Sequence, residues 1–226
     1  MHGCNDSVGA RFIAPAYDTI AATSYELSED RRNMNFIFDI GNVLINYKPL
    51  EYLEGLFSEH SLIERLNQAV FLSQEWVYLD LGIITYREAC DSLCTREPDI
   101  EQDILSTMRN VHSMFTPITE TVELLPEIKS SGHRLYYLSN IHKETRDYLL
   151  REYRFFDLFD GGVYSCDINI MKPSPEIYRY LMSSCKLNPD DCLFFDDVKE
   201  NVIAASNEGI KGVLFTGAEC VRPFLK

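Results

Sequence analysis

Four short polar motifs in this chain have the residue types of a site that handles an anion and a divalent cation. They are Asp39, Ser139-Asn140, Lys172 and Asp196-Asp197. Three carboxylates in one cleft repel one another and raise one another's pKa unless a cation joins them, and oxygen ligands suit Mg²⁺ better than zinc. A lysine and a hydroxyl beside such a metal favour an anion, of which phosphate is the obvious one. A carboxylate that attacks phosphorus gives an aspartyl-phosphate intermediate.

Buried strands are expected to position these motifs. The apolar run Phe36-Ile37-Phe38 ends at Asp39, and further apolar runs that alternate with helical segments are expected as strands. These runs cover residues 134–138, 161–165, 192–195 and 212–215. Strand–helix alternation predicts a parallel sheet with right-handed crossovers, whose strands all end at one edge. Ligands bind at that edge in open α/β sheets, so the motifs should converge there. Taken alone, Asp39 is equally well explained as the cap of a helix or turn.

Residues 47–115, after the first strand, have helical periodicity. Capping-box spacing in 61–64 and in 85–88 predicts a helix start at each position. The module is too small and too tightly bracketed to be an independent domain. Its single tryptophan, Trp76, and the aromatics Phe71, Tyr78 and Tyr86 are expected in the module's core. Alternatively, one of these four aromatics lines a substrate pocket.

Composition limits the classes of protein to consider. The chain has 226 residues, a hydrophobic content of 46% and a formal net charge of −14, which fit one large globular domain or a domain with an insertion. The negative charge argues against nucleic acid or an anionic membrane as a partner. The seven cysteines are scattered without a C-x-x-C pair, which supports neither a disulfide framework nor a zinc ribbon. No apolar run reaches the ~20 residues of a membrane span, so we expect a cytoplasmic protein.

Residues 1–33 are weakly patterned and lack the basic start and long apolar core of a secretory signal. They end in a charged cluster, and Met34 stands directly before the first strand. We expect residues 1–33 to be a dispensable or poorly ordered extension, with Met34 as the hypothetical true start.

The four motifs resemble those of the haloacid dehalogenase superfamily, in order, over residues 34–220. The chain is most similar to helical-cap, phosphatase-like members that begin with F-D-x-G-N-V, including glucose-1-phosphatase-like enzymes. The resemblance implies an α/β fold with a Rossmann-like parallel sheet core and a helical cap inserted after the first strand. The core would comprise 34–46 and 116–226, and the cap 47–115 would close over the site and select substrate.

The resemblance also implies roles for the motif residues. Asp39 would be the nucleophile, and Asp39, the Gly41 backbone carbonyl and Asp197 would hold Mg²⁺ with Asp196 beside it. Ser139, helped by Asn140, would hold the transferring phosphoryl oxygens. Lys172 would neutralise the charge that develops on them. The small-molecule partner would be a phosphate ester, for which a sugar phosphate is the first candidate, and the protein would be a monomer or homodimer.

One departure from the family pattern concerns the proton donor. Many of these phosphatases carry a second Asp two residues after the nucleophile, and here that position is Gly41. Either a cap residue donates the proton (Glu75, Asp80 and Tyr86 are candidates), or the leaving group needs little help, or the enzyme is slow. General acid catalysis typically contributes about 10²–10⁴-fold.

Other polar residues near the motifs are more simply explained by structural roles than by contact with substrate. His142, just after the serine motif, more simply caps or solvates a helix than contacts substrate. Asn201, one helical turn after Asp197, would steady the metal-site loop, and Glu200 would do the same or be solvated.

Two alternative functions stay open. In a dehalogenase, Asp39 would attack carbon without Mg²⁺, but such relatives usually lack the acid pair Asp196-Asp197. A catalytically weak, phospho-ligand-binding member is compatible with Gly41, whereas the intact Asp39, Lys172 and Asp197 weigh against it. A receiver domain does not fit the helical insertion.

Overall fold

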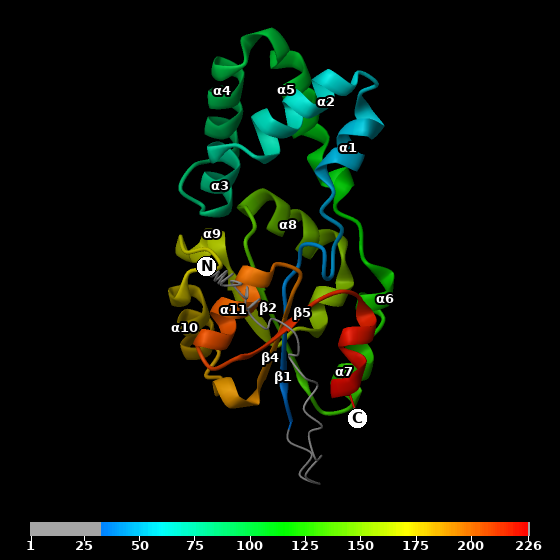
Figure 1. The fold of residues 1–226 in the computed structure, drawn as a ribbon, viewed down its shortest axis with the longest axis vertical. Coiled ribbons are helices and arrows are strands. Elements are labelled where there is room, and N and C mark those ends of the chain that lie inside the picture. The colour runs from blue at the N-terminus through cyan, green and yellow to red at the C-terminus, as the bar shows by residue number, and fades with distance from the viewer. Residues whose placement is uncertain (1–32, 226) are drawn as a thin grey trace, which may run out of the picture. The chain divides into compact units, whose positions relative to one another are not determined.

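The computed structural model describes residues 33–225, so the predicted extension over 1–33 lies outside the described part except for its last residue. Five strands form one parallel sheet in the order β3-β2-β1-β4-β5, which confirms the predicted α/β fold (Figure 1). They are β1 (Asn35–Phe38), β2 (Arg134–Ser139), β3 (Gly161–Tyr164), β4 (Cys192–Asp196) and β5 (Lys211–Leu214). β1 lies at the centre because the chain adds β2 and β3 on one side of it and β4 and β5 on the other.

The central strands are apolar on both faces, as expected for a sheet that is covered on both sides. In β1, Phe36 and Phe38 belong to one buried cluster and Ile37 to the other. In β4, Phe195 belongs to the first cluster and Phe194 to the second, in the same alternation. This period of two leaves no face of these strands for water, so polar residues collect at the strand ends.

Helices cover the two faces of the sheet in separate layers. On the face of Ile37 lie α10 (Pro175–Ser184) and α11 (Lys199–Asn207), whose apolar residues share its cluster. On the opposite face lie α7 (Leu125–Ser130) and α8 (Lys143–Glu152). The remaining short helices of this part are α6 (Thr119–Val122), α9 (Ser165–Ile168) and the 3₁₀ turns Arg154–Leu158, Pro189–Asp191, Ala218–Cys220 and Arg222–Phe224.

A helical region, here called the helical insertion, joins β1 to β2 on the side where the strands end (Figure 1). Its α-helices are α1 (Pro49–Leu56), α2 (His60–Leu66), α3 (Gln74–Asp80), α4 (Tyr86–Arg96) and α5 (Glu101–Asn110). A π-helix (Asn67–Phe71) and 3₁₀ turns at Pro98–Ile100 and Val111–Met114 complete it. The insertion confirms the helical region that the sequence predicts after the first strand.

The two predicted capping boxes have different outcomes. At α4 both halves of the box are present, with the Thr85 side chain accepting from the Glu88 backbone N–H and the Glu88 side chain accepting from that of Thr85. The prediction at Ser61 is wrong, because α2 begins at His60, two residues earlier than a helix capped by Ser61, and has Glu59 as its N-cap. The Ser61 hydroxyl instead donates to the Glu59 carboxylate at 2.6 Å.

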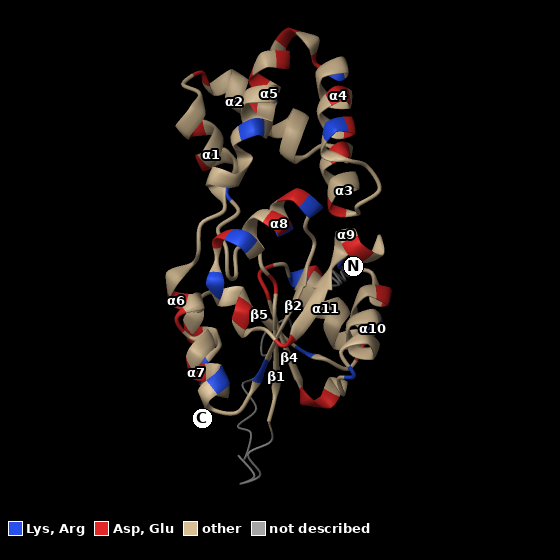
Figure 2. Ribbon diagram, turned by 180° about the vertical axis from the view of Figure 1, so that it is seen from behind, with Lys and Arg blue, Asp and Glu red and all other residues tan. Residues whose placement is uncertain are grey.

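The surface of the described part carries both signs of charge. Figure 2 shows Lys and Arg interspersed with Asp and Glu along α4 and α8. The cysteines of the described part are free. Within residues 33–225, no helix combines the length and apolar character that crossing a membrane requires.

Candidate active site

The carboxyl ends of β1 and β4 place three aspartates together. Asp39 follows β1 and still belongs to the sheet edge, because its backbone N–H donates to the Phe195 carbonyl at 2.9 Å. Asp196 is the last residue of β4, and Asp197 comes next. The chain reverses its direction of strand addition between these two strands, which makes the crevice at their ends the expected ligand site of an open α/β sheet.

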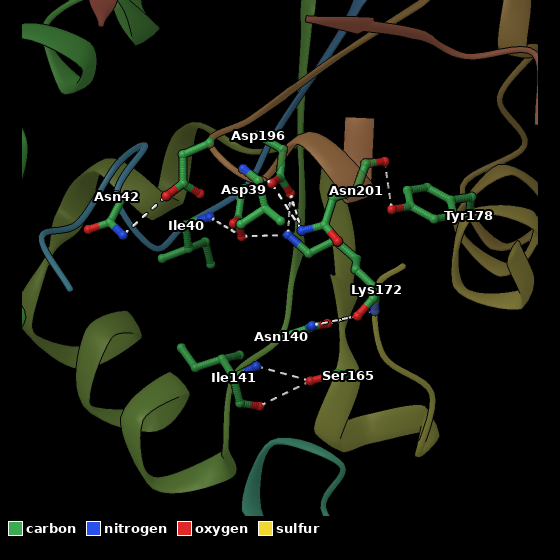
Figure 3. A network of polar contacts seen from close by, with 12 residues as sticks. Asp39, Ile40, Asn42, Asn140, Ile141, Ser165, Lys172, Tyr178, Asp196 and Asn201 are labelled. Atoms are coloured by element: carbon green, nitrogen blue, oxygen red, sulfur yellow. Dashed lines mark hydrogen bonds and ion pairs between the residues drawn. The ribbon is translucent and has the colours of Figure 1, made fainter. Parts of the chain in front are cut away.

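Lys172 reaches these carboxylates from the segment before α10. Its ammonium lies 2.8 Å from Asp39 Oδ1 and 2.7 Å from Asp196 Oδ2, and its side chain is 1% exposed (Figure 3). Asn140 fixes the lysine backbone, since its side-chain amide donates to the Lys172 carbonyl at 2.9 Å and accepts from the Lys172 N–H at 2.8 Å. The lysine is therefore held at both its backbone and its charged end.

The two neighbouring aspartates have different surroundings. Asp196 is fully buried, and both its carboxylate oxygens accept from Asn201, at 3.0 and 3.1 Å, in addition to the bond from Lys172. Asp197 is half-buried, lines the cavity described below and accepts from the Asn42 amide at 3.2 Å. Asp196 thus anchors Lys172 and Asn201, whereas Asp197 faces the open space.

Burial and crowding of like charges shift the pKa values of the site. Burial raises the pKa of Asp39 to about 6, and the Asp196 carboxylate adds to this rise while Lys172 opposes it. Burial also raises the pKa of Asp197, again with a contribution from Asp196. Burial alone would lower the pKa of Lys172, but the carboxylates of Asp39 and Asp196 hold it above its usual value. One buried ammonium therefore leaves part of the carboxylate repulsion uncompensated.

The donor set fits a hard divalent cation. Asp39, Asp196 and Asp197 can each offer an oxygen such that the three atoms lie within 4.8 Å of one another. Carboxylate oxygens without sulfur or imidazole suit Mg²⁺ rather than zinc. A cation there would relieve the repulsion that raises the pKa values of Asp39 and Asp197.

A cavity of about 260 Å³ opens between these carboxylates and the helical insertion. The cavity is lined by Asp39, Gly41, Ser139, Asn140, Lys172 and Asp197. The structure therefore brings together all of the predicted site residues, because Asp196, which is fully buried and does not line the cavity, contacts Lys172 directly. Its remaining wall is largely aromatic and aliphatic, and includes Tyr47, Trp76, Phe115 and Leu149. The pocket alternative for Trp76 is thereby supported, although Trp76 is also buried against Phe71.

The three candidate proton donors of the insertion differ in position. Asp80, the last residue of α3, lines the cavity. Glu75 is paired with Arg96 at 2.6 Å, and the Tyr86 hydroxyl donates to the Met108 carbonyl at 2.5 Å. Neither Glu75 nor Tyr86 is among the described residues that line the cavity.

His142 and Asn201 both occupy defined places. His142 is the N-cap residue of α8, but its side chain makes no capping hydrogen bond. It is 1% exposed and lines the cavity, so it is not a solvated helix-end residue. Asn201 is 6% exposed and bonded to Asp196, so it steadies the acid pair.

Sequence reasoning missed Asn42 and Ser165. Asn42 has a left-handed backbone (φ 53°) in the turn after Asp39 and joins that turn to Asp197. Ser165 follows β3, and its hydroxyl donates to the Asp80 carbonyl at 2.5 Å and accepts from the Ile141 N–H at 3.0 Å. The signal for Ser165 was present, because it is a polar residue at the end of an apolar run, as Asp39 is.

Sequence comparison finds relatives among hydrolases. The family model for haloacid dehalogenase-like hydrolases matches residues 34–209. The sesquiterpene phosphatase astK of Aspergillus oryzae is 28% identical over 180 residues, which cover 80% of this chain and 88% of the relative. The bifunctional epoxide hydrolase 2 of Rattus norvegicus is 32% identical over 74% of this chain, but the match spans only 31% of that longer protein.

Solved structures share the fold. A HAD family enzyme of Bacteroides thetaiotaomicron, in complex with magnesium and inorganic phosphate, superposes with a TM-score of 0.66 at 22% identity, covering 82% of this chain and 96% of that one. The L-2-haloacid dehalogenase of Xanthobacter autotrophicus superposes with a TM-score of 0.60 at 18% identity, covering 80% of this chain and 76% of that one. The family match, which extends over most of the chain and contains the aspartate cluster, shows that this protein belongs to the haloacid dehalogenase-like hydrolases.

Proposed function

We propose that this protein is a Mg²⁺-dependent phosphatase that hydrolyses a small phosphomonoester through an aspartyl-phosphate on Asp39. The observation that carries the proposal is the buried Asp39 carboxylate, which shares Lys172 with Asp196 and has Asp197 within reach of the same cation. A dehalogenase needs no cation, so this excess of carboxylates favours phosphoryl chemistry over the dehalogenase alternative. The magnesium and phosphate in the Bacteroides neighbour, and the name of the Aspergillus oryzae relative, agree with it.

Each residue of the site has a proposed task. With its pKa of about 6, Asp39 is mostly ionised at neutral pH and attacks phosphorus, while the bond from phosphorus to the leaving oxygen breaks. The Ser139 hydroxyl donates a hydrogen bond to a phosphoryl oxygen, and Lys172 neutralises the charge on the equatorial oxygens. Water then hydrolyses the acyl phosphate and regenerates Asp39. Asn140, whose amide is occupied by Lys172, contributes by placing that lysine.

Mg²⁺ held by Asp39, Asp197 and the Gly41 carbonyl, with Asp196 beside them, would supply positive charge to the carboxylates and to the phosphoryl group. The helical insertion would act as the cap, with residues 47–115 as its bounds and 34–46 and 116–226 as the core domain. A cap that closes over the cavity excludes water from the acyl phosphate until the leaving alcohol has departed.

Two substrate classes follow from the cavity. A sugar phosphate, the first candidate from the sequence, would find polar partners in Asp80, His142 and Thr145. A phosphate ester of an apolar alcohol is favoured by the wall of Tyr47, Trp76, Phe115 and Leu149 and by the sesquiterpene phosphatase relative. The cavity volume, near the lower limit of the ~300–1,000 Å³ typical of ligand pockets, restricts either class to small molecules.

The test is phosphate release from a panel of sugar phosphates, apolar alkyl phosphates, nucleotides and acyl phosphates, with Mg²⁺ and with EDTA. Asp39→Asn, which keeps the shape of the side chain, serves as the blank. We expect release that needs both Mg²⁺ and Asp39, and the ranking of kcat/KM identifies the substrate class.

Two other outcomes would contradict the proposal. Chloride release from 2-chloropropionate in EDTA, without phosphate release from any ester, would establish the dehalogenase instead. Mg²⁺ binding without turnover of any substrate would establish the catalytically weak, phospho-ligand-binding alternative.

A further inference from the structure

The leaving oxygen needs a proton, and the usual position of its donor is occupied by Gly41. A Cβ atom built on Gly41 would meet only the Tyr47 Cβ, at 3.9 Å, so the space beside the nucleophile is open rather than filled by another group. We propose that Asp80, held by His142, is the general acid and base of this enzyme. This inference rests on the proposed phosphatase function and names a catalytic residue for it.

Asp80 and His142 both line the cavity and contact each other. Asp80 belongs to the helical insertion, and His142 belongs to the core segment between Ser139 and α8. The Asp80 Oδ1 lies 3.4 Å from the His142 Nδ1, and the His142 Nε2 lies 2.7 Å from the Thr145 hydroxyl. Both ring nitrogens therefore have protein partners, while the second carboxylate oxygen of Asp80 is not used in this contact.

The other titratable groups of the cavity are unsuited to the task. Among the described residues that line it, these groups are Asp39, Tyr47, Lys172 and Asp197 in addition to the pair. Asp39, Lys172 and Asp197 are committed to the nucleophile, the phosphoryl charge and the cation. Burial, reinforced by the charge of Asp80, raises the pKa of Tyr47 well above the usual phenol value, so this hydroxyl keeps its proton.

Further contacts fix Asp80 in place. The Ser165 hydroxyl donates to the Asp80 carbonyl at 2.5 Å, and the Asn169 amide donates to the carbonyl of Leu81 at 2.7 Å. Both donors belong to or directly follow α9, which lies beside the end of α3 (Figure 1). The Trp76 ring packs edge-on against the His142 ring at 5.0 Å and restricts the imidazole. A group held this way meets the positional demand of proton transfer.

The first step of the proposed reaction starts from a pair that has taken up a proton, on Asp80 or shared with His142. As Asp39 attacks phosphorus, the bond from phosphorus to the leaving oxygen breaks. That oxygen takes the proton from Asp80, and the leaving group departs as the neutral alcohol. In the second step a water attacks the phosphorus of the aspartyl-phosphate and gives its proton to the Asp80 carboxylate. The bond from phosphorus to the Asp39 carboxylate oxygen breaks, inorganic phosphate departs, and both the Asp39 carboxylate and the protonated pair are restored.

The experiment compares substrates that differ in their need for a proton. A 4-nitrophenolate leaves without protonation, whereas an alkoxide does not, so the variants are assayed with 4-nitrophenyl phosphate and with the best alkyl phosphate of the panel. Asp80→Asn, which preserves the contact with His142, is expected to lower kcat/KM about 10²–10⁴-fold for the alkyl ester and hardly at all for the nitrophenyl ester. His142→Asn should show the same substrate dependence, and the double variant should be no worse than Asp80→Asn alone because the two residues act as a unit.

Asn169→Gly is the matched control for a merely structural role. It removes the contact to the neighbouring carbonyl of Leu81, and glycine accepts the left-handed backbone of this position (φ 57°). It should change the rates with both substrates by the same factor. An equal loss with both substrates in Asp80→Asn, or no loss with either, overturns the inference and leaves the phosphatase intact. An absence of Asp39-dependent phosphate release in the wild type overturns the proposed function itself.

Discussion

Lys172 illustrates how single residues of the site depend on one another. A buried ammonium is costly unless it is paired, and here the carboxylates of Asp39 and Asp196 pair with it while Asn140 holds the lysine backbone. The arrangement leaves Asp39 with a raised pKa, because burial and Asp196 outweigh the attraction of Lys172. Without a cation, the repulsion between the Asp39 and Asp196 carboxylates therefore remains partly uncompensated, and a bound cation would relieve it.

Because the ionised Asp39 carboxylate is unfavourable in the folded state, we expect Asp39→Asn to stabilise the protein when no metal is bound. The pKa of Asp39 rises from 3.8 to about 6 on folding, so the folded state keeps a proton that the unfolded chain releases. Stability of the wild type should therefore fall relative to Asp39→Asn as the pH rises from about 4 to about 6, by at most about 3 kcal/mol, and level off above. Urea unfolding of both proteins in EDTA across this pH range measures the difference.

Asp160→Asn supplies a control of opposite sign. Burial works against the Asp160 charge, but the ion pair with Lys129, at 2.7 Å, holds the pKa of this carboxyl below its usual value. Its contribution is present at neutral pH and lost on acidification, so Asp160→Asn should cost most stability at neutral pH. The prediction is contradicted if the stability of Asp39→Asn relative to the wild type changes with rising pH in the same direction as that of Asp160→Asn.

The polar residues at strand ends were predictable, whereas their cross-chain partners were not. Asp39, Asp196 and Asp197 stand out in the sequence because a charge next to an apolar run needs a partner. The bond from Asn42 to Asp197 joins residues 155 positions apart, and the contact of Ser165 with Asp80 joins residues 85 apart. No local pattern encodes such pairs, since they depend on how the insertion and the core meet.

At the scale of elements, the strands were predictable to within a few residues because each is a short apolar run between polar turns. The helix starts were less certain. Thr85 caps α4 as expected, but the hydroxyl of Ser61 pairs with Glu59 and the helix begins earlier. A capping motif competes with every other partner that its side chain can reach.

The contact between α3 and α9 sets the position of Asp80, and Gly82 makes this contact possible. Gly82 has a left-handed backbone (φ 68°), and a Cβ atom there would lie 2.3 Å from the Cys166 carbonyl oxygen. We expect Gly82→Ala to destabilise the protein by about 1–3 kcal/mol through backbone strain and to lower kcat/KM with every substrate. Unfolding curves and the phosphate-release assay measure the two effects.

Gly55→Ala is the matched control for this substitution. Gly55 lies in α1, and a Cβ atom there meets nothing within 4 Å. Alanine in a helix is more favourable than glycine by up to about 1 kcal/mol, so stability should be unchanged or slightly raised and activity unaffected. Equal effects of the two substitutions would mean that the α3–α9 contact has no special importance.

At the scale of the whole molecule, the helical insertion and the sheet share one hydrophobic cluster. Leu53, Leu93 and Ile104 of the insertion belong to the same buried cluster as Phe36 and Phe195 of the sheet. The described residues form one compact unit. The small size of the helical insertion already indicated that it does not fold independently of the sheet. That the two share one core becomes visible only when the side chains of both are placed together.

A shared core predicts that the insertion does not unfold before the sheet. Trp76, the single tryptophan, reports on the junction of the two, because its ring contacts Tyr47 and His142. Tryptophan fluorescence and far-UV circular dichroism should therefore give coincident urea unfolding curves. Saturating Mg²⁺ should move both midpoints to higher urea by the same amount, since ligand binding to the folded state stabilises the whole cooperative unit, and this shift should shrink in Asp39→Asn. A fluorescence transition at lower urea than the circular dichroism transition would instead mean that the insertion opens independently and that its contacts with the core contribute little to stability.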